Sequence, residues 1–214
     1  MGRRCGLPAV ASLVVDLDQA IRRRHMVRTF ADRPLPAGAL DRLLDLTCRA
    51  PSAGNAGGWA VVVMEGPEDT AVFWDMTTTE DWRSRSRRWG GLRSAAAVVV
   101  FLSDRDAYLR RYAATDKASS GLDDAERWPI PYWFVDVGMA IMTMLLAATG
   151  EAIGAAFLGN FRGEAQLLRA LRVPGGLRYA GAVVLGWPEE SDPPSTSARL
   201  AHRQPDDVVH RGRW

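Results

Sequence analysis

The sequence predicts a single domain in which one β-sheet is covered by helices on both faces. Short runs that are apolar at every position recur along the chain, and such runs are typical of strands buried on both faces. Between them lie longer stretches whose apolar residues recur at helical spacing. No repeat or linker divides the 214 residues, a length that can bury a complete core. Mixed helices and strands without a linker favour one layered domain.

In the N-terminal part of this domain, the sequence predicts two helices followed by a strand. Asp16 can cap a helix that continues to about Met26, because an aspartate accepts hydrogen bonds from the free N–H groups of a first turn. Residues 30–36 contain two prolines and form a connector. Leucines at helical spacing predict a second helix at 37–49. The fully apolar run 60–64 then predicts a buried strand.

The central part of the sequence contains a basic and aromatic segment. Residues 74–93 carry three tryptophans and five arginines, as a nucleic-acid patch with interleaved aromatics would. The alternative, which we favour, is a surface loop or helix with amphipathic side chains. The net charge of +2 does not by itself imply a nucleic-acid partner. Residues 95–102 predict a second buried strand, and the polar stretch 104–127 predicts an excursion or lid.

The C-terminal half predicts the most apolar helix and two further strands. Residues 135–150 are apolar nearly all round, which indicates a central helix or an interface helix. No window approaches about 18 unbroken apolar residues, so we expect no membrane span. Residues 153–158 and 179–186 predict the third and fourth strands, with a short helix at 162–171 between them.

The N-terminus is interpreted as a leader or strap over residues 1–15 and not as a secretory signal. Its apolar run is weak and is closed early by Asp16 and Asp18. Residues 16–214 are expected to form the single domain, and we expect a cytoplasmic protein.

Self-sufficient catalytic motifs are not found in the sequence. His25, His202 and His210 lack a metal-binding spacing. The serine elbow, the GxGxxG fingerprint and the GxxxxGK[ST] phosphate loop are also missing. We therefore expect no metal site, and we expect a cofactor to supply the chemistry of any enzyme built on this chain.

Four local segments could contact a cofactor. The basic segment 22–30 could bind a phosphate if its backbone is extended, or it could be a solvated helix end. The segment 50–59 is rich in small residues that let a backbone approach a flat ligand, but it could also be a turn-rich loop. Residues 154–161 are bounded by glycines and could present a backbone N–H, and Arg203 lies in a basic segment near the end of the chain.

The order and spacing of these four segments resemble the nitroreductase-like FMN family over about residues 18–214. The family pattern R-R-S-V-R-x-F reads RHMVRTF here, and A-P-S-x-x-N-x-Q-P-W reads APSAGNAGGW. The glycine-rich stretch after the long central helix reads GAAFLGNF, and HRQP follows the strand that ends VLGWP. The resemblance implies an α+β fold, a three-layer sandwich with a mostly antiparallel central sheet flanked by helices, and an intertwined homodimer with FMN at the interface.

The resemblance also assigns a cofactor site. Arg24 and Arg203 would bind the FMN phosphate, and Arg28 would face the ribityl and pyrimidine side, where a reduced flavin is often an anion. The complete set expected to bind FMN is Arg24, His25, Met26, Arg28, Pro51, Ser52, Asn55, Gly57, Leu158, Gly159 and Arg203.

Two parts of this site carry further implications. Ser52 and Asn55 would touch the flavin from the partner subunit, and Gly159 would lie where a backbone N–H meets flavin N5. Met26 replaces a serine of the family pattern, and the pair Gly57-Gly58 replaces Gln-Pro. These departures imply weaker retention of FMN or a roomier substrate side.

The function implied is that of an FMN-dependent oxidoreductase with ping-pong chemistry. NAD(P)H would reduce the bound FMN, and a planar aromatic acceptor such as a nitroaromatic or quinone would then be reduced. The flavin carries the chemistry, so no catalytic residue is assigned. Trp133, Phe134 and the excursion at 104–132 could cover the ring, or they could be core or surface packing.

Two alternative functions remain. One is a dehydrogenase or other specialised reaction of the same family, including consumption of the flavin. The other is a flavin-binding protein with little turnover. No nucleic-acid or membrane partner is expected.

Overall fold

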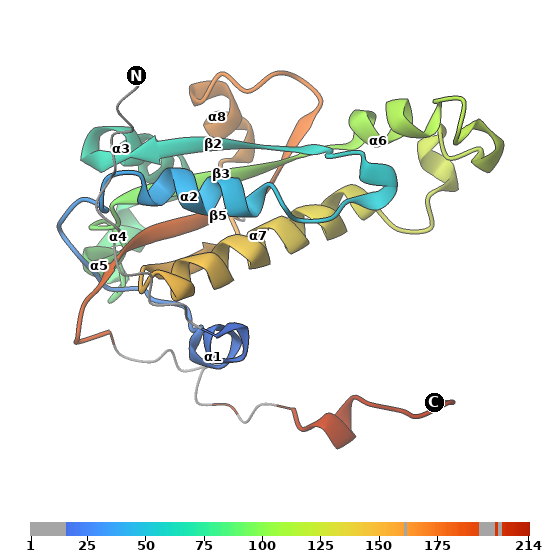
Figure 1. Ribbon diagram of the computed structural model, residues 1–214. Helices are drawn as coiled ribbons and strands as arrows, with labels where there is room; N and C mark the ends of the chain where they lie inside the picture. Colours follow the sequence, from blue (N-terminus) through green and yellow to red (C-terminus); the bar gives the residue numbers. More distant parts are fainter. Residues whose placement is uncertain (1–15, 161, 193–199, 201–202) are drawn as a thin grey trace, which may run out of the picture.

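The computed structural model describes residues 16–160, 162–192, 200 and 203–214, and its centre is an antiparallel sheet (Figure 1). The strands are β1 (Phe30–Ala31), β2 (Trp59–Glu65), β3 (Ala97–Asp104), β4 (Gly154–Leu158) and β5 (Leu177–Pro188). Their order is β1-β5-β3-β2, with β4 also paired to β5, and each of these pairings is antiparallel. The predicted mostly antiparallel sheet is therefore confirmed.

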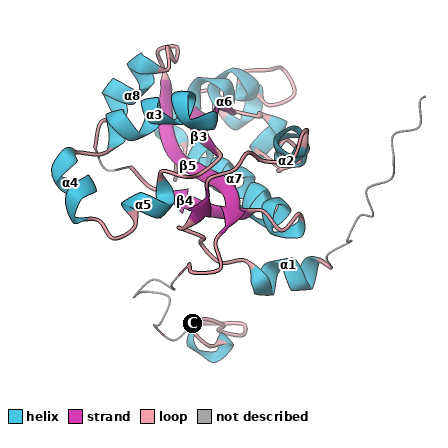
Figure 2. Cartoon of the chain, turned by 90° about the vertical axis from the view of Figure 1, so that its left-hand side faces the viewer, coloured by secondary structure: helices cyan, strands magenta, loops and turns pink. Residues whose placement is uncertain are grey.

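The sheet separates two hydrophobic clusters because successive side chains of a strand point to opposite faces. On β3, Val99 and Phe101 belong to one cluster, whereas Val98 and Val100 belong to the other. The first cluster is closed by helices α2 (Ala39–Thr47) and α7 (Tyr132–Gly150). The second is closed by α3 (Gly66–Thr77) and α8 (Glu164–Ala170). The three-layer α+β sandwich is thus confirmed, and Figure 2 shows the helices on both sides of the sheet.

Shorter helices complete the described chain. They are α1 (Leu17–Arg23), α4 (Glu80–Arg85), α5 (Trp89–Leu92) and α6 (Arg105–Tyr112). Asp16 caps α1 as predicted, its side chain accepting a hydrogen bond from the N–H of Asp18 at 3.4 Å. The helix ends at Arg23 and not near Met26. The polar excursion opens with α6, so its first turns are ordered as a helix.

Helix α7 is the long apolar helix that the sequence predicts. Among the described residues it alone is long and apolar enough to cross a membrane, a test of length and composition only, with 19 residues and a mean hydropathy of 1.5. One side of it, including Val137, Ala140 and Met144, is buried in the first cluster. The opposite side leaves apolar residues exposed, among them Val135 and Met142. Helix α7 is therefore a central helix with one uncovered face.

Three expectations about these elements need correction. Strand β2 lies at the edge of the sheet, so Val63 is 37% exposed instead of buried. Trp74, in the segment interpreted as a surface element, is buried and stacks edge-on against Phe73. Most of helix α3, residues 66–73, lies where no element was expected. Residues 1–15, interpreted as a leader or strap, lie outside the described residues.

Candidate functional site

The basic segment after α1 leaves the helix and runs beside β4. Arg24 is the C-cap of α1, with extended backbone angles, and its N–H still bonds to the carbonyl of Ala20 at 3.0 Å. The N–H of Val27 donates to the carbonyl of Ala155 on β4 at 3.0 Å. The sulfur of Met26 accepts from the N–H of Phe157 at 3.3 Å. The segment is therefore extended, which is the form expected to bind a phosphate.

The side chains of this segment concentrate positive charge. Arg24 is partly buried, and its Nη1 atom is shielded from solvent without a hydrogen-bond partner among the described residues. Burial lowers the pKa of the Arg28 guanidinium, and the positive charge of Arg88 lowers it further, while the carboxylate of Asp192 partly opposes both. An anion between these groups would therefore be stabilised.

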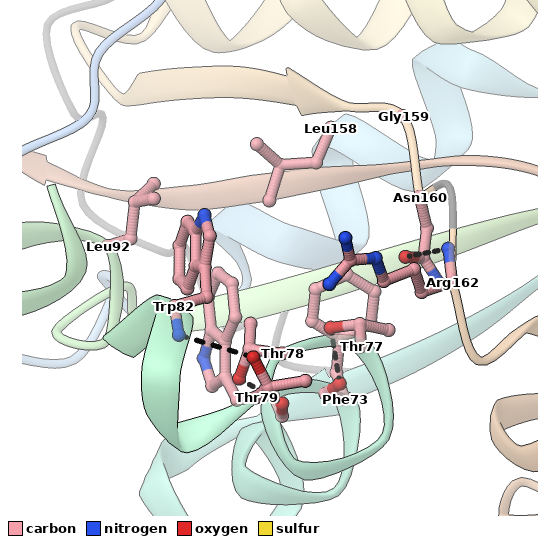
Figure 3. Close-up of a pocket in the computed structure, with 11 residues that line it drawn as sticks. Phe73, Thr77, Thr78, Thr79, Trp82, Leu92, Leu158, Gly159, Asn160 and Arg162 are labelled. Atoms are coloured by element: carbon pink, nitrogen blue, oxygen red, sulfur yellow. Dashed lines mark hydrogen bonds between the residues drawn. The ribbon is translucent and has the colours of Figure 1, made fainter. Parts of the chain in front are cut away.

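A cavity of about 420 Å³ opens where β4 ends (Figure 3). Leu158, Gly159 and Asn160 form one wall, and residues 77–79 with Trp82 form the opposite wall. The side chain of Arg162 points between them toward the middle of the cavity. The volume lies within the range of about 300–1,000 Å³ found for small-molecule and cofactor sites.

Two buried donors lie in residues that line this cavity. The Nε1 atom of Trp74 and the Nδ2 atom of Asn160 are shielded from solvent without a partner in the described chain. Because a buried donor left without a partner is costly, such atoms mark places where a ligand could bind. Leu92 of α5 also lines the cavity, and the neighbouring Gly91 packs against the backbone of Thr29. The basic segment therefore lies next to the cavity.

Residues 51–58, within the second predicted segment 50–59, form a tight loop at the start of α7. The hydroxyl of Ser52 accepts a hydrogen bond from the N–H of Gly57 at 2.9 Å. Asn55 is exposed and has a positive φ of 55°. The N–H of Ala53 donates to the buried carboxylate of Asp136 on α7 at 2.7 Å. The loop is thus ordered by its own hydrogen bonds and by α7.

The expectation of a roomier site at Gly57 and Gly58 is wrong for Gly58. A Cβ atom at Gly58 would lie 2.2 Å from the ring of Tyr108 on α6, so the aromatic ring already fills that space. Gly57 has open space around it, but its φ of 57° favours glycine. The replacement of Gln-Pro by two glycines is explained by packing against Tyr108 and by backbone shape.

Comparison with known proteins gives the family of this fold and site. Residues 21–187 match the Nitroreductase family. The chain belongs to that family. It is similar to 5,6-dimethylbenzimidazole synthase of Rhodospirillum rubrum, at 28% identity over 91% of this chain and 93% of that protein. It is also similar to 4-nitrobenzoate reductase of Nocardioides sp., at 25% identity over 94% and 90% of the two chains.

A solved structure confirms the nitroreductase fold. A protein from Exiguobacterium sibiricum, described as a nitroreductase in complex with FMN, matches with a TM-score of 0.70 at 15% identity. The match covers 92% of this chain and 97% of that one.

The single nitroreductase chain brings together only part of the predicted site. Met26 lies beside β4, and Leu158 with Gly159 lines the cavity at the end of that strand. The loop with Pro51, Ser52 and Asn55 lies at the N-terminal end of α7, apart from α1 in Figure 1.

Two other residues predicted to bind FMN make only local hydrogen bonds among the described contacts. His25 is exposed, and its ring hydrogen-bonds to the carbonyl of Arg23 at 3.0 Å. Arg203 is exposed in the C-terminal tail and donates to the carbonyl of Asp207 at 2.6 Å, within its own turn. Figures 1 and 2 show this tail apart from the domain.

Three features of this site are not among the residues expected from the sequence. Residues 77–79 form a cavity wall, and Arg162 points into it, without a motif that would single them out. Asp136 holds the loop 51–58, and here a signal exists. It is the only charged residue within the long apolar helix, and a buried charge requires partners.

Proposed function

We propose that this nitroreductase-family chain is an FMN-dependent oxidoreductase that takes electrons from NAD(P)H and delivers them to a planar aromatic acceptor. The observation that carries the proposal is the cavity at Leu158 and Gly159, next to a segment with a partnerless buried arginine atom. The FMN complex of the Exiguobacterium sibiricum protein and the name of the Nocardioides relative support the cofactor and the reaction class.

The residues present fit the phosphate and ring of FMN. The Nη1 atom of Arg24 lacks a partner, and a phosphate oxygen is the acceptor that an arginine binds best. Negative charge would also relieve the repulsion between Arg28 and Arg88. Within the cavity, Trp74 and Asn160 have free donors for the polar atoms of a flavin. FMN, when bound, supplies the hydride and electron chemistry, and the protein supplies binding and orientation.

We also propose that the site is completed by a second copy of the chain. The uncovered face of α7 and Phe157 border an apolar hollow of about 340 Å³, lined in part by Met26, Phe134 and Met142. Helices with exposed apolar faces are typical of interfaces. Ser52 and Asn55 lie apart from Arg24 within one chain, so they would reach the same flavin only from a partner subunit. A homodimer through α7 would bury the apolar face and unite the two parts.

The first experiment tests which cofactor the protein binds and which nucleotide donates electrons to it. Apoprotein is titrated with FMN, and the complex is then titrated without oxygen with NADH and with NADPH. We expect stoichiometric FMN binding and bleaching of the flavin absorbance by at least one nucleotide. Binding without bleaching would instead support a flavin-binding protein with little turnover, and no uptake of FMN would refute the proposal.

The second experiment asks for the acceptor. Trp82 lines the cavity with a flat apolar surface, which favours offset stacking of planar acceptors. Reoxidation of the reduced enzyme is followed by stopped flow with quinones, nitroaromatics, enones and dioxygen. We expect the quinones and nitroaromatics to react fastest. Faster reaction with enones or dioxygen would refute the aromatic acceptor and favour a dehydrogenase or oxidase.

A second candidate function follows from the relative in Rhodospirillum rubrum. That protein is named 5,6-dimethylbenzimidazole synthase, and the chain matches it over 93% of its length. A comparable activity here would consume the flavin instead of recycling it. Chromatography of the flavin pool after aerobic incubation with NAD(P)H separates the two. Full recovery of FMN supports the oxidoreductase, and loss of FMN with formation of a benzimidazole supports the second candidate.

A further inference from the structure

The polar excursion that begins with α6 is built directly onto the loop 51–58. The Nε atom of Arg111 donates to the carbonyl of Gly54 at 2.8 Å. A Cβ atom at Gly54 would lie 2.9 Å from the ring of Tyr112, and one at Gly58 would meet Tyr108. Helix α6 and the loop are therefore in close contact through two aromatic rings and one hydrogen bond.

A single buried carboxylate joins these two segments to α7. One oxygen of Asp136, Oδ2, accepts the hydrogen bond from the N–H of Ala53 at 2.7 Å. The same oxygen accepts from the hydroxyl of Tyr108 at 2.6 Å. Asp136 is 1% exposed, so water does not compete for either bond. Burial of Tyr108 raises the pKa of its hydroxyl, and the bond to Asp136 raises it further, so the hydroxyl remains a donor.

We propose that Asp136 is a positioning residue that couples residues 105–133, which we call the lid segment, to the loop 51–58, which would face FMN. Because it is buried, it would touch neither cofactor nor substrate. It fixes the backbone of Ala53, beside Ser52, and makes the position of that loop depend on Tyr108 of the lid. The inference deepens the proposed function and rests on it in one respect, namely that Ser52 and Asn55 face the flavin.

The test compares variants that remove or keep the acceptor at position 136. Asp136→Ala removes it, whereas Asp136→Asn keeps an oxygen that can accept both bonds. Tyr108→Phe removes only the hydroxyl donor. Tyr112→Phe is the matched control, because it removes a tyrosine hydroxyl from the same helix that is not bonded to Asp136.

The first readout is hydrogen–deuterium exchange in the full-length apoprotein, which does not depend on FMN. We expect Asp136→Ala to speed amide exchange in both 51–58 and 105–112 by roughly tenfold or more, since a buried hydrogen bond is lost at each. Asp136→Asn should restore most of the protection. Unchanged exchange in Asp136→Ala, or faster exchange in only one of the two segments, would overturn the coupling.

The second readout is the affinity for FMN and the visible spectrum of the bound flavin. We expect Asp136→Ala to raise the Kd for FMN by roughly tenfold or more and to shift the flavin spectrum, with rescue by Asp136→Asn. Tyr108→Phe should have a smaller effect, and that effect should vanish in the Asp136→Ala background.

The outcomes separate this inference from the proposed function. A wild-type protein that binds no FMN refutes the proposed function, while exchange still decides the coupling. Wild-type FMN affinity in both Asp136→Ala and Tyr108→Phe overturns the inference alone. If Asp136→Ala does not fold, the comparison of Tyr108→Phe with Tyr112→Phe tests the coupling by the same two readouts. Equal behaviour of these two variants would overturn the inference.

Discussion

Arg24 is the residue on which phosphate binding is expected to depend most. It follows α1 at the point where the backbone becomes extended, and its Nη1 atom is buried without a partner. Replacing Arg24 with Ala should cost about 1.5–3 kcal/mol of FMN binding, the range for a hydrogen bond to a charged group. The Kd for FMN, measured by fluorescence titration of the apoprotein, should rise by about 10- to 150-fold.

The control for this substitution is Arg22, two residues earlier in α1. Arg22 is exposed and pairs with Asp18 at 2.8 Å, a surface contact that contributes little. Arg22→Ala should leave the affinity for FMN within about twofold. Equal loss of affinity in Arg22→Ala and Arg24→Ala would indicate general electrostatics instead of a specific phosphate contact.

Gly58 should tolerate no side chain, because the ring of Tyr108 occupies the position of a Cβ atom. Gly58→Ala should lower the free energy of unfolding by about 1–3 kcal/mol, the usual cost of overpacking. Gly90 on α5 has open space where its Cβ would be, so Gly90→Ala should be neutral or stabilising. Urea denaturation of both variants measures the difference, and equal stabilities would contradict the packing argument.

At the scale of elements, the lid segment 105–133 is held together by aromatic rings around Trp128. The centroid of Trp128 lies 4.9 Å from Tyr112 and 5.8 Å from Tyr132, and its Nε1 atom donates to the carbonyl of Leu122 at 2.9 Å. The ring also packs edge-on against Tyr108 and Trp133. These aromatics are therefore structural, and the lid has a small core of its own.

Trp128→Ala should loosen this element without unfolding the sheet. The free energy of opening this element should fall by about 2 kcal/mol. This is less than for a fully buried tryptophan, because Trp128 is partly exposed. Hydrogen exchange should become faster across 105–133 and stay slow in β3 and β5. Trp82→Ala, in α4, serves as the comparison and should leave exchange of the lid unchanged. Faster exchange throughout the sheet would show that the lid is part of the main folding unit.

The elements that the sequence predicts well are those whose own composition is decisive. Strands β3 and β5 are apolar at nearly every position because both faces are buried, and their predicted limits are close to the observed ones. Strand β1 has only two residues and exists through pairing with the distant end of β5, so no local pattern could predict it. Helix α3 carried a usable signal, a proline in its first turn followed by two acidic residues.

In the candidate site, too, some residues can be predicted from a local motif, and others only from contacts made by the fold. Leu158 and Gly159 are found from a local motif and do line the cavity. Asp136 is chemically conspicuous, but its partners Ala53 and Tyr108 are 83 and 28 residues away, so only the fold identifies its role. The tail with Arg203 is apart from the domain in a single chain, and its predicted contact with phosphate stays a prediction.

At the scale of the whole molecule, the uncovered face of α7 predicts self-association. Met142 is 46% exposed and lines the apolar hollow next to Phe157. Met142→Glu would bury an unpaired charge in the proposed dimer, so the dissociation constant of the dimer should rise at least about 100-fold. Sizing with light scattering measures the change, and Ala165→Glu at an exposed position of α8 is the control. A wild-type monomer at micromolar concentration would refute the dimer.

The segment that carries Arg24 also covers part of a strand edge. Among the described residues, strand β4 pairs only with β5, and the hydrogen bonds from Val27 and to Met26 occupy part of its other edge. An uncovered strand edge is a template for pairing with another chain. If a phosphate anchors Arg24, it also holds this cover in place, so FMN acts as a folding ligand. At 100 times its Kd, a ligand of this kind adds about 2.7 kcal/mol to the stability of the folded state. We therefore expect protein without FMN to aggregate more readily than protein with FMN bound.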